Sequence, residues 1–204
     1  MSTSPADDLV RLDTGTSIWS RTFTVSPLVV VGTKEEGEGY DLAPKHLAMP
    51  LGWENYFGFV CTPRHATYRN ARREGAFTVS YPRPTQVVIT SLTASGRKGP
   101  EGPKPIVDTL DTVPATVVDG LFLRDAYLFL ECELYRVVDG FGGEAELVTG
   151  RIVAARAHPD AVRVTEGDDG RLIHDAPLLA YLNPGRFASV GQSHPFPFPA
   201  GFLR

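Results

Sequence analysis

Short apolar runs separated by glycine- and proline-containing turns recur along the chain, and several alternate apolar with polar residues as strands do. Runs of this kind, rich in valine, leucine and aromatic residues, occupy residues 27–33, 40–49, 56–62 and 76–82. The first three follow one another closely, with a polar, glycine-containing connection after the first. They predict three consecutive antiparallel strands, and the fourth run predicts another strand of the same sheet.

The two strongest strand patterns come later, at residues 126–139 and 145–157. The glycine-rich segment "GFGG" joins these two runs, so the pair predicts a long hairpin. Because this segment connects two strands and does not open a helix, it is not a dinucleotide-binding turn.

Two segments have helical features. Residues 66–75, "ATYRNARREG", place Tyr68 and Ala71 at helical offsets and end in Gly75, which predicts a short surface helix. Residues 85–96 are long enough for a helix but rich in β-branched residues, so both a helix and a strand fit; we favour the helix.

The remaining segments are irregular. Residues 97–120 mix prolines and glycines without a motif and predict a long functional loop. The chain as a whole, residues 1–204, predicts one domain with its core at about residues 25–191. We expect an N-terminal tail at 1–17 and, at 192–204, a proline-rich arm that lies extended over another surface.

Several strands in meander order with few helices favour an antiparallel barrel over an open sheet, because closure removes exposed edges. The formal net charge of -4 and the isoelectric point near 5.7 provide no basic field for nucleic-acid binding. The first residues lack the features of a secretory signal, and the apolar runs are too short to cross a bilayer. We therefore expect no nucleic-acid partner, no membrane association and a cytoplasmic location.

Several kinds of chemistry have no support in the sequence. No serine lies in a G-x-S-x-G context, and the histidines and cysteines lack metal-ligand spacing, so neither a serine nucleophile nor a metal site is predicted. Cys61 and Cys132 each lie among strand residues, which predicts two buried free thiols.

Polar side chains suited to a phosphate follow two of the predicted strands. They are Lys45, His46, Thr62, Arg64, His65 and Thr67. If the strands at 40–49 and 56–62 are adjacent, these side chains converge, and cations, hydroxyls and helix N–H groups together suit a phosphate. The neighbouring Leu47, Ala48 and Met49 would then face a flat ring.

A simpler interpretation exists for the arginines in this region. Arg64, Arg69, Arg72 and Arg73 could form the solvated face of a surface helix, and spacing alone favours that interpretation over phosphate binding.

The order of the segments along the chain favours phosphate binding over a solvated helix face. "VVVGT", "LAPKHLAMPL", "FGFVCTPRHATYRNARREGAFTVSYP", "LECELYRVVD" and "ELVTGRIVAARAHPDAV" follow one another in an order that resembles the flavin reductase-like family of FMN-binding split barrels. The resemblance covers residues 25–191 approximately, and residues 63–82 are its most specific part.

The resemblance implies a mainly β fold: a six-stranded antiparallel split β-barrel of the Greek-key, FMN-binding type with a few short helices. It also implies a homodimer that holds FMN, or FAD as the alternative, near the subunit interface. By the same resemblance, one group of residues lines the flavin ring and a second binds its phosphate and ribityl chain. The ring group is Lys45, His46, Leu47, Ala48 and Met49, and the phosphate group is Thr62, Arg64, His65, Thr67 and Tyr68.

The implied activity is an NAD(P)H:flavin oxidoreductase that uses NADH or NADPH and supplies reduced flavin to a separate monooxygenase, with no catalytic residue assigned. Many family members carry serine and threonine where this chain has "KHLAMPLGW", so Lys45 or His46 is expected to tune the flavin. The 97–120 loop is expected to cover the nicotinamide or substrate side. Two alternatives remain: a flavin-binding electron carrier with little NAD(P)H oxidation, and a barrel that binds another phosphorylated ligand.

Overall fold

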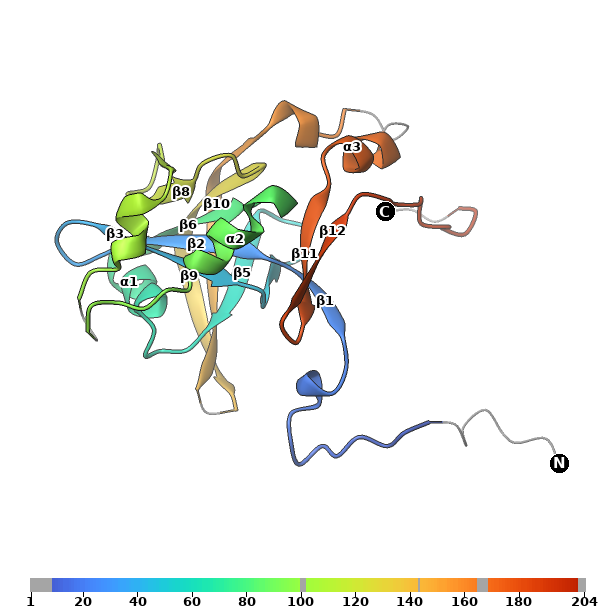
Figure 1. Ribbon diagram of the computed structural model, residues 1–204, viewed down its shortest axis with the longest axis horizontal. Helices are drawn as coiled ribbons and strands as arrows, with labels where there is room; N and C mark the ends of the chain where they lie inside the picture. Colours follow the sequence, from blue (N-terminus) through green and yellow to red (C-terminus); the bar gives the residue numbers. More distant parts are fainter. Residues whose placement is uncertain (1–8, 100–101, 143, 165–168, 202–204) are drawn as a thin grey trace.

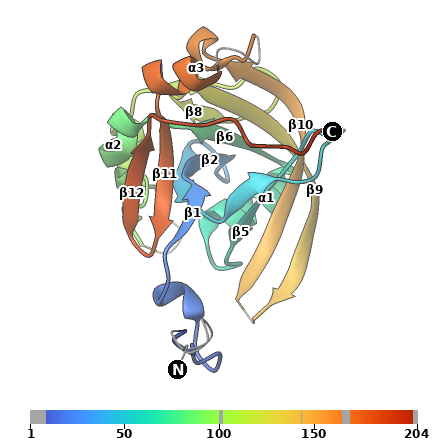
Figure 2. The ribbon, with the colours of Figure 1, turned by 90° about the vertical axis from the view of Figure 1, so that its right-hand side faces the viewer.

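The computed structural model describes residues 9–99, 102–142, 144–164 and 169–201. A curled antiparallel sheet of seven strands forms the body, in the order β3-β2-β6-β9-β10-β5-β4 (Figure 1; Figure 2). Its strands are β2 (Val29–Lys34), β3 (Tyr40–Lys45), β4 (Ala48–Pro50), β5 (Tyr56–Cys61), β6 (Ala76–Tyr81), β9 (Leu128–Phe141) and β10 (Ala145–Ala157). The predicted fold class is confirmed, with seven strands in this sheet where six were expected.

The extra strand arises because the predicted strand at 40–49 is broken. β3 ends at Lys45 and β4 begins at Ala48, yet these two strands lie at opposite edges of the sheet. His46 and Leu47, which we call the β3–β4 link, therefore carry the chain from one edge to the other. The Leu47 carbonyl accepts a hydrogen bond from the N–H of Val60 at 2.8 Å, so the link also pairs with β5.

The predicted three-strand meander is wrong. β3 pairs with β2, whereas β5 pairs with β10 along its whole length and with β4 over residues 57–59. The long hairpin explains the difference: β10 provides a partner for all six residues of β5, and such non-local pairing does not show in local alternation. The hairpin of β9 and β10 was predicted correctly.

Two smaller sheets accompany the barrel, and the sequence patterns did not predict them. One contains β1 (Thr24–Pro27), β11 (Leu178–Asn183) and β12 (Arg186–Val190), and it stands at one side of the barrel in Figure 1. The other pairs β7 (Thr112–Pro114) with β8 (Leu121–Leu123). The 97–120 segment is thus not entirely loop, since it contains β7 and the 3₁₀ helix η4 (Pro105–Thr109).

The predicted helices are confirmed. α1 (Ala66–Glu74) ends at Gly75, whose φ of 67° is the left-handed conformation that glycine adopts without strain. α2 (Val87–Leu92) is shorter than the predicted 85–96 segment. The remaining helical elements are α3 (Asp169–Asp175), η2 (Ile18–Ser20), η3 (Pro84–Gln86) and η5 (Pro159–Ala161). None of the helices within the described residues is long and apolar enough to cross a membrane.

Large aromatic side chains fill the barrel. Phe57, Phe59 and Phe77 are each at most 1% exposed, and the rings of Phe59 and Phe77 meet edge to face at 5.2 Å. Burying a side chain of this size contributes about 1.5 to 3 kcal/mol. A second buried cluster joins Val30 to Val107, so η4 packs on the opposite face of β2.

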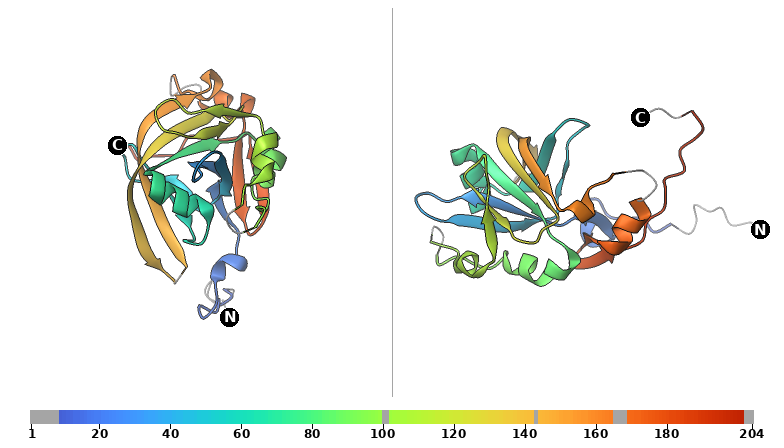
Figure 3. Two further views of the ribbon diagram at one scale, coloured as in Figure 1. Left: turned by 90° about the vertical axis from the view of Figure 1, so that its left-hand side faces the viewer. Right: turned by 90° about the horizontal axis from the view of Figure 1, so that it is seen from above.

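The C-terminal arm leaves the barrel after β12. Figure 3 shows this segment running away from the body, and Phe196 and Phe198 are 71% and 41% exposed. Which surface the arm covers therefore stays a prediction. Residues 1–8 of the predicted N-terminal tail and residues 202–204 of the arm lie outside the described residues.

Candidate functional site

The β3–β4 link brings Lys45 close to Cys61 and His65. The Cys61 sulfur lies 3.9 Å from the His65 Nδ1 atom. Burial lowers the pKa of His65, and the charges of Lys45 and Arg64 lower it further. Burial raises the pKa of Cys61, and the nearby Lys45 lowers it by a smaller amount. The two predicted polar segments do converge, because the barrel closes here and not because β3 and β5 are neighbours.

The N-terminal end of α1 faces this cluster without a cap. His65 occupies the N-cap position, its side chain makes no capping hydrogen bond, and no acidic residue lies in the first turn. The first N–H groups of any helix lack partners within the helix and carry positive partial charge. The end of α1 and Lys45 therefore create a region of positive potential.

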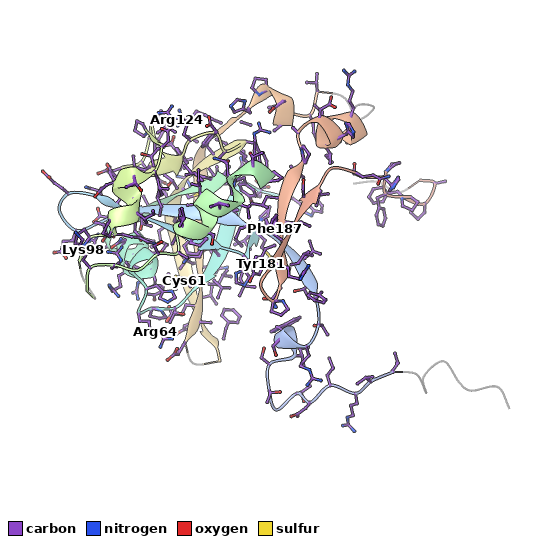
Figure 4. The ribbon with its side chains drawn as sticks, in the orientation of Figure 1. Cys61, Arg64, Lys98, Arg124, Tyr181 and Phe187 are labelled. Carbon is purple, nitrogen blue, oxygen red and sulfur yellow. The ribbon has the colours of Figure 1, made fainter. Side chains whose placement is uncertain are left out.

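Arg64 lies at the rim of this region, on the surface (Figure 4). Its side chain is 69% exposed and forms an ion pair with Glu144 at 2.9 Å. Exposed ion pairs contribute little to stability, so releasing Glu144 from Arg64 would cost little. Thr62, two residues earlier, is half-buried.

Thr67 and Tyr68 turn their side chains inward. The Thr67 hydroxyl donates to the Asp41 carboxylate at 2.7 Å. The Tyr68 hydroxyl donates to Glu146 and accepts a hydrogen bond from Arg72 at 3.0 Å. Both side chains hold α1 against the barrel, so what these two residues offer at the helix end is their backbone N–H groups.

Residues 45–49, which were predicted to line the flavin ring, are partly exposed. Ala48 is buried, whereas Leu47 and Met49 are 53% and 51% exposed. His46 packs on Tyr181 of β11, with ring centroids 4.4 Å apart. Burial and the charge of Lys45 lower the pKa of His46, so its imidazole is neutral at pH 7.

The other arginines of α1 are held by protein groups. Arg73 donates to the carbonyl of Lys34 at 2.9 Å and to Asn70 at 3.1 Å. Arg69 donates to the Arg64 carbonyl. These contacts tie α1 to β2 and to the residues just before it, yet the arginines are all exposed, as the interpretation of a solvated helix face expects.

Asp41 is a central residue that the sequence patterns did not identify. It is 2% exposed, and its carboxylate lies 3.0 Å from Arg97 and 3.2 Å from Lys104 in addition to the bond from Thr67. Burial would raise the pKa of Asp41, but Lys104, Thr67 and Arg97 together hold it below its usual value. One aspartate in an alternating strand gives no local signal of this role.

A polar cleft of about 430 Å³ lies on the far side of α1, beside the segment that carries Arg97 and Lys104. Residues of both charges line it, including Arg69, Arg73 and Glu35. The cleft adjoins the predicted covering loop, whose role over a nicotinamide or substrate stays a prediction. No group of three or more histidine, cysteine, aspartate or glutamate side chains in the described part of the chain could hold a metal ion.

The family described as "Flavin reductase like domain" matches residues 20–188 of this chain. The chain belongs to the flavin reductase-like family. Membership supports a flavin-related oxidoreductase. Among curated protein sequences, none matches this flavin reductase-like chain.

Solved structures share the fold of this flavin reductase-like chain at low sequence identity. A putative flavin reductase with a split barrel domain from Shewanella frigidimarina is 16% identical, with a TM-score of 0.73, covering 86% of this chain and 87% of that one. Flavoredoxin from Methanosarcina acetivorans is 16% identical, with a TM-score of 0.72 and coverages of 95% and 97%. An FMN-binding protein from Thermus thermophilus with bound p-hydroxybenzaldehyde is 19% identical, with a TM-score of 0.67 and coverages of 85% and 91%.

The two thiols of this flavin reductase-like chain should react slowly with alkylating reagents in the folded state. Cys132 is fully buried, and burial followed by the charge of Glu131 raises its pKa to about 12; Cys61 is 4% exposed. Because the thiolate is the reactive form, both should remain unmodified by iodoacetamide at pH 8 and react quickly in urea. Mass spectrometry after timed labelling measures this, and rapid labelling of Cys132 in the native protein would contradict it.

Proposed function

We propose that this chain binds FMN and transfers a hydride to it from NADH or NADPH. The observation that carries the proposal is the uncapped N-terminal end of α1 beside Lys45, in a chain whose family is flavin reductase-like. FAD is the alternative flavin. Reduced flavin would then pass to a separate monooxygenase.

The phosphate would bind at the end of α1. Backbone N–H groups of its first turn would donate to the phosphate oxygens, and Lys45 and Arg64 would supply positive charge. Arg64 would exchange its ion pair with Glu144 for the phosphate. Thr62 and His65 lie at the same turn and would add hydrogen bonds.

The flavin ring would lie along the β3–β4 link and β4. Leu47 and Met49 are the exposed apolar side chains there, and they would exclude water from one face of the ring. When bound, FMN supplies the redox chemistry by taking up the hydride at N5. Of the two candidate cations, His46 is neutral at pH 7, so Lys45 is the residue that would stabilise negative charge on the ring.

A second copy of the chain would complete this site. Apolar side chains near the link are unusually exposed: Leu47 at 53%, Met49 at 51%, Trp53 at 101%, Phe23 at 71% and Val25 at 70%. Exposed apolar surface of this kind is typical of a protein interface. We therefore propose a homodimer, which light scattering on the purified protein tests directly.

The second candidate is an electron carrier that holds FMN but oxidises little NAD(P)H by itself. The fold similarity to a protein named flavoredoxin keeps this candidate open. The third candidate is a barrel that binds another phosphorylated ligand. It stays open because the end of α1 would contact the phosphate and not the rest of the ligand. The cytoplasmic location stays a prediction.

A visible absorption spectrum distinguishes the three candidates. The protein is mixed with FMN, freed of excess flavin, and then treated anaerobically with NADH and with NADPH. Retained flavin that bleaches supports the reductase and identifies its donor, and retained flavin that stays yellow supports the carrier. A protein that retains no flavin and does not accelerate NAD(P)H oxidation in the presence of free FMN contradicts both.

Replacing Arg64 with alanine should weaken FMN binding by about 1.5 kcal/mol, which is roughly tenfold in the dissociation constant. The expected loss is at the low end for a charge-assisted contact, because the side chain is largely exposed and must release Glu144. Fluorescence titration of FMN measures it. Arg151→Ala, at an exposed arginine of β10 paired with Glu133, is the control and should bind as the wild type does. Equal affinity of Arg64→Ala and wild type would remove Arg64 from the site.

A further inference from the structure

A separate cleft lies between α2, the β11–β12 hairpin and the β3–β4 link. Its volume is about 310 Å³, at the lower end of the range for small-molecule sites. Tyr181 and Phe187 of the hairpin lie beside α2 in Figure 4. No residue of α1 lines this cleft, so it is distinct from the proposed phosphate site.

The walls of this cleft suit a flat ring. His46 and Tyr181 stack at 4.4 Å with 30° between their ring planes and present one aromatic surface. Val87 of α2 and Phe187 of β12, the latter 54% exposed, add apolar surface. Aromatic rings bind to such walls through offset or tilted stacking.

The charge of the lining favours an anion. Arg186, the first residue of β12, lines the cleft, whereas no aspartate or glutamate does. Within the described residues Arg186 has no ion pair with a carboxylate. A guanidinium at the edge of an apolar cleft binds a carboxylate through two parallel hydrogen bonds.

An unsatisfied hydroxyl lies in the same wall. Thr90 of α2 lines the cleft and is fully buried, and its hydroxyl is the one buried side-chain polar atom of the described residues without a hydrogen-bond partner. A buried hydroxyl without a partner destabilises the fold. A ligand in the cleft would offer this hydroxyl the partner that it lacks.

We propose that this cleft binds a small aromatic carboxylate. The ring lies between the His46–Tyr181 pair and α2, the carboxylate pairs with Arg186, and Thr90 supplies a hydrogen bond. His46 belongs to the β3–β4 link, so the bound acid lies next to the segment proposed to hold the flavin ring. The binding itself does not depend on flavin.

Calorimetric titration of the full-length protein with benzoate tests the proposal. Benzoate should bind with a dissociation constant of about a millimolar or below, as expected for a ligand of this size. Benzyl alcohol, which keeps the ring and lacks the charge, should bind at least about tenfold more weakly because it cannot form the charge-assisted contact.

Variants locate the site. Ala94→Trp introduces a large side chain at an exposed residue of the lining and should abolish benzoate binding. Arg186→Gln should weaken it about tenfold. Arg151→Gln changes an exposed arginine outside the lining and should leave it unchanged.

Thr90→Val distinguishes a role of Thr90 in benzoate binding from a purely structural role. The substitution removes an unpartnered hydroxyl at nearly constant shape, so the melting temperature should rise while benzoate affinity falls severalfold. Unchanged affinity together with a higher melting temperature would remove Thr90 from the site.

Three results would overturn the proposal: no heat of binding with benzoate, equal affinity for benzyl alcohol, or benzoate binding that survives Ala94→Trp. The titrations are run with and without FMN. Retained FMN without benzoate binding rejects this inference alone, whereas benzoate binding without any FMN binding supports it and rejects the proposed function.

Discussion

Replacing Asp41 with asparagine should lower the free energy of unfolding by about 3 to 5 kcal/mol. The carboxylate is 3% exposed and contacts Lys104, Arg97 and Thr67. Removing one partner of a buried ion pair leaves the other charge desolvated without compensation, and here two cations lose the same anion. The 97–120 segment should loosen as well, since Arg97 and Lys104 anchor it to β3.

The effect should depend on pH in a defined direction. The pKa of Asp41 is lower in the folded protein than in the unfolded chain, so the stabilisation is fully present above the unfolded value of about 3.9. It is lost as the pH falls below that value and through the folded pKa. The stability difference between wild type and Asp41→Asn should therefore be constant near neutrality and shrink in acid.

Urea denaturation from pH 3 to pH 7 measures both effects. Asp119→Asn is the matched control, because Asp119 is exposed and its carboxylate accepts the hydroxyl of Tyr40 at 2.7 Å without an ion pair among the described residues. This control should change stability by less than about 0.5 kcal/mol. A loss below about 1 kcal/mol for Asp41→Asn, or a loss that grows in acid, would contradict the assigned role of the carboxylate.

Replacing Glu131 with glutamine should cost about 2 to 4 kcal/mol of stability. Glu131 is 1% exposed in β9, and its carboxylate accepts the N–H groups of Thr116, Val117 and Val118 and the hydroxyl of Thr116. An amide offers one oxygen to these donors and turns its own N–H₂ group toward them. Burial would raise the pKa of Glu131, but the three backbone N–H groups and the Thr116 hydroxyl together lower it.

Urea denaturation measures the loss, and hydrogen exchange at the amides of residues 116–118 locates it. These amides should exchange at least about tenfold faster in Glu131→Gln, whereas the β6–β9 ladder keeps its protection. Glu133→Gln, on the same strand but exposed and paired with Arg151, is the control and should change little. Unchanged exchange at 116–118 would mean that the carboxylate does not hold this turn.

Local pattern predicted the elements whose partners are close in sequence. The β9–β10 hairpin and α1 follow from alternation, a glycine-rich turn and the stop at Gly75, because hydrogen bonds within a hairpin or a helix join nearby residues. The β11–β12 hairpin was not predicted, although it is equally local. Its asparagine-proline-glycine turn was the available signal.

The convergence of the candidate site was predicted, but for the wrong reason. Lys45 and His65 were expected to meet because their strands would be neighbours, whereas the strands lie apart in the sheet and the β3–β4 link joins its two edges. Thr67 and Tyr68 were expected to face a phosphate, and in the structure their side chains face Asp41 and Glu146. Tyr68 and Ala71, which the pattern placed at helical offsets, do lie on the buried face of α1, and Thr67 lies on the same face.

By itself, the sequence determined the β-rich class, the long hairpin, α1 and, through the order of its segments, the flavin reductase-like family. Only the tertiary structure decided the closure of the barrel at the β3–β4 link, the burial of Asp41 and Glu131, and the cleft beside α2. These features depend on contacts between residues far apart along the chain: Asp41 meets Lys104, and His46 meets Tyr181. Local propensity carries no information on such pairs, because the contacts exist only once the sheet has closed.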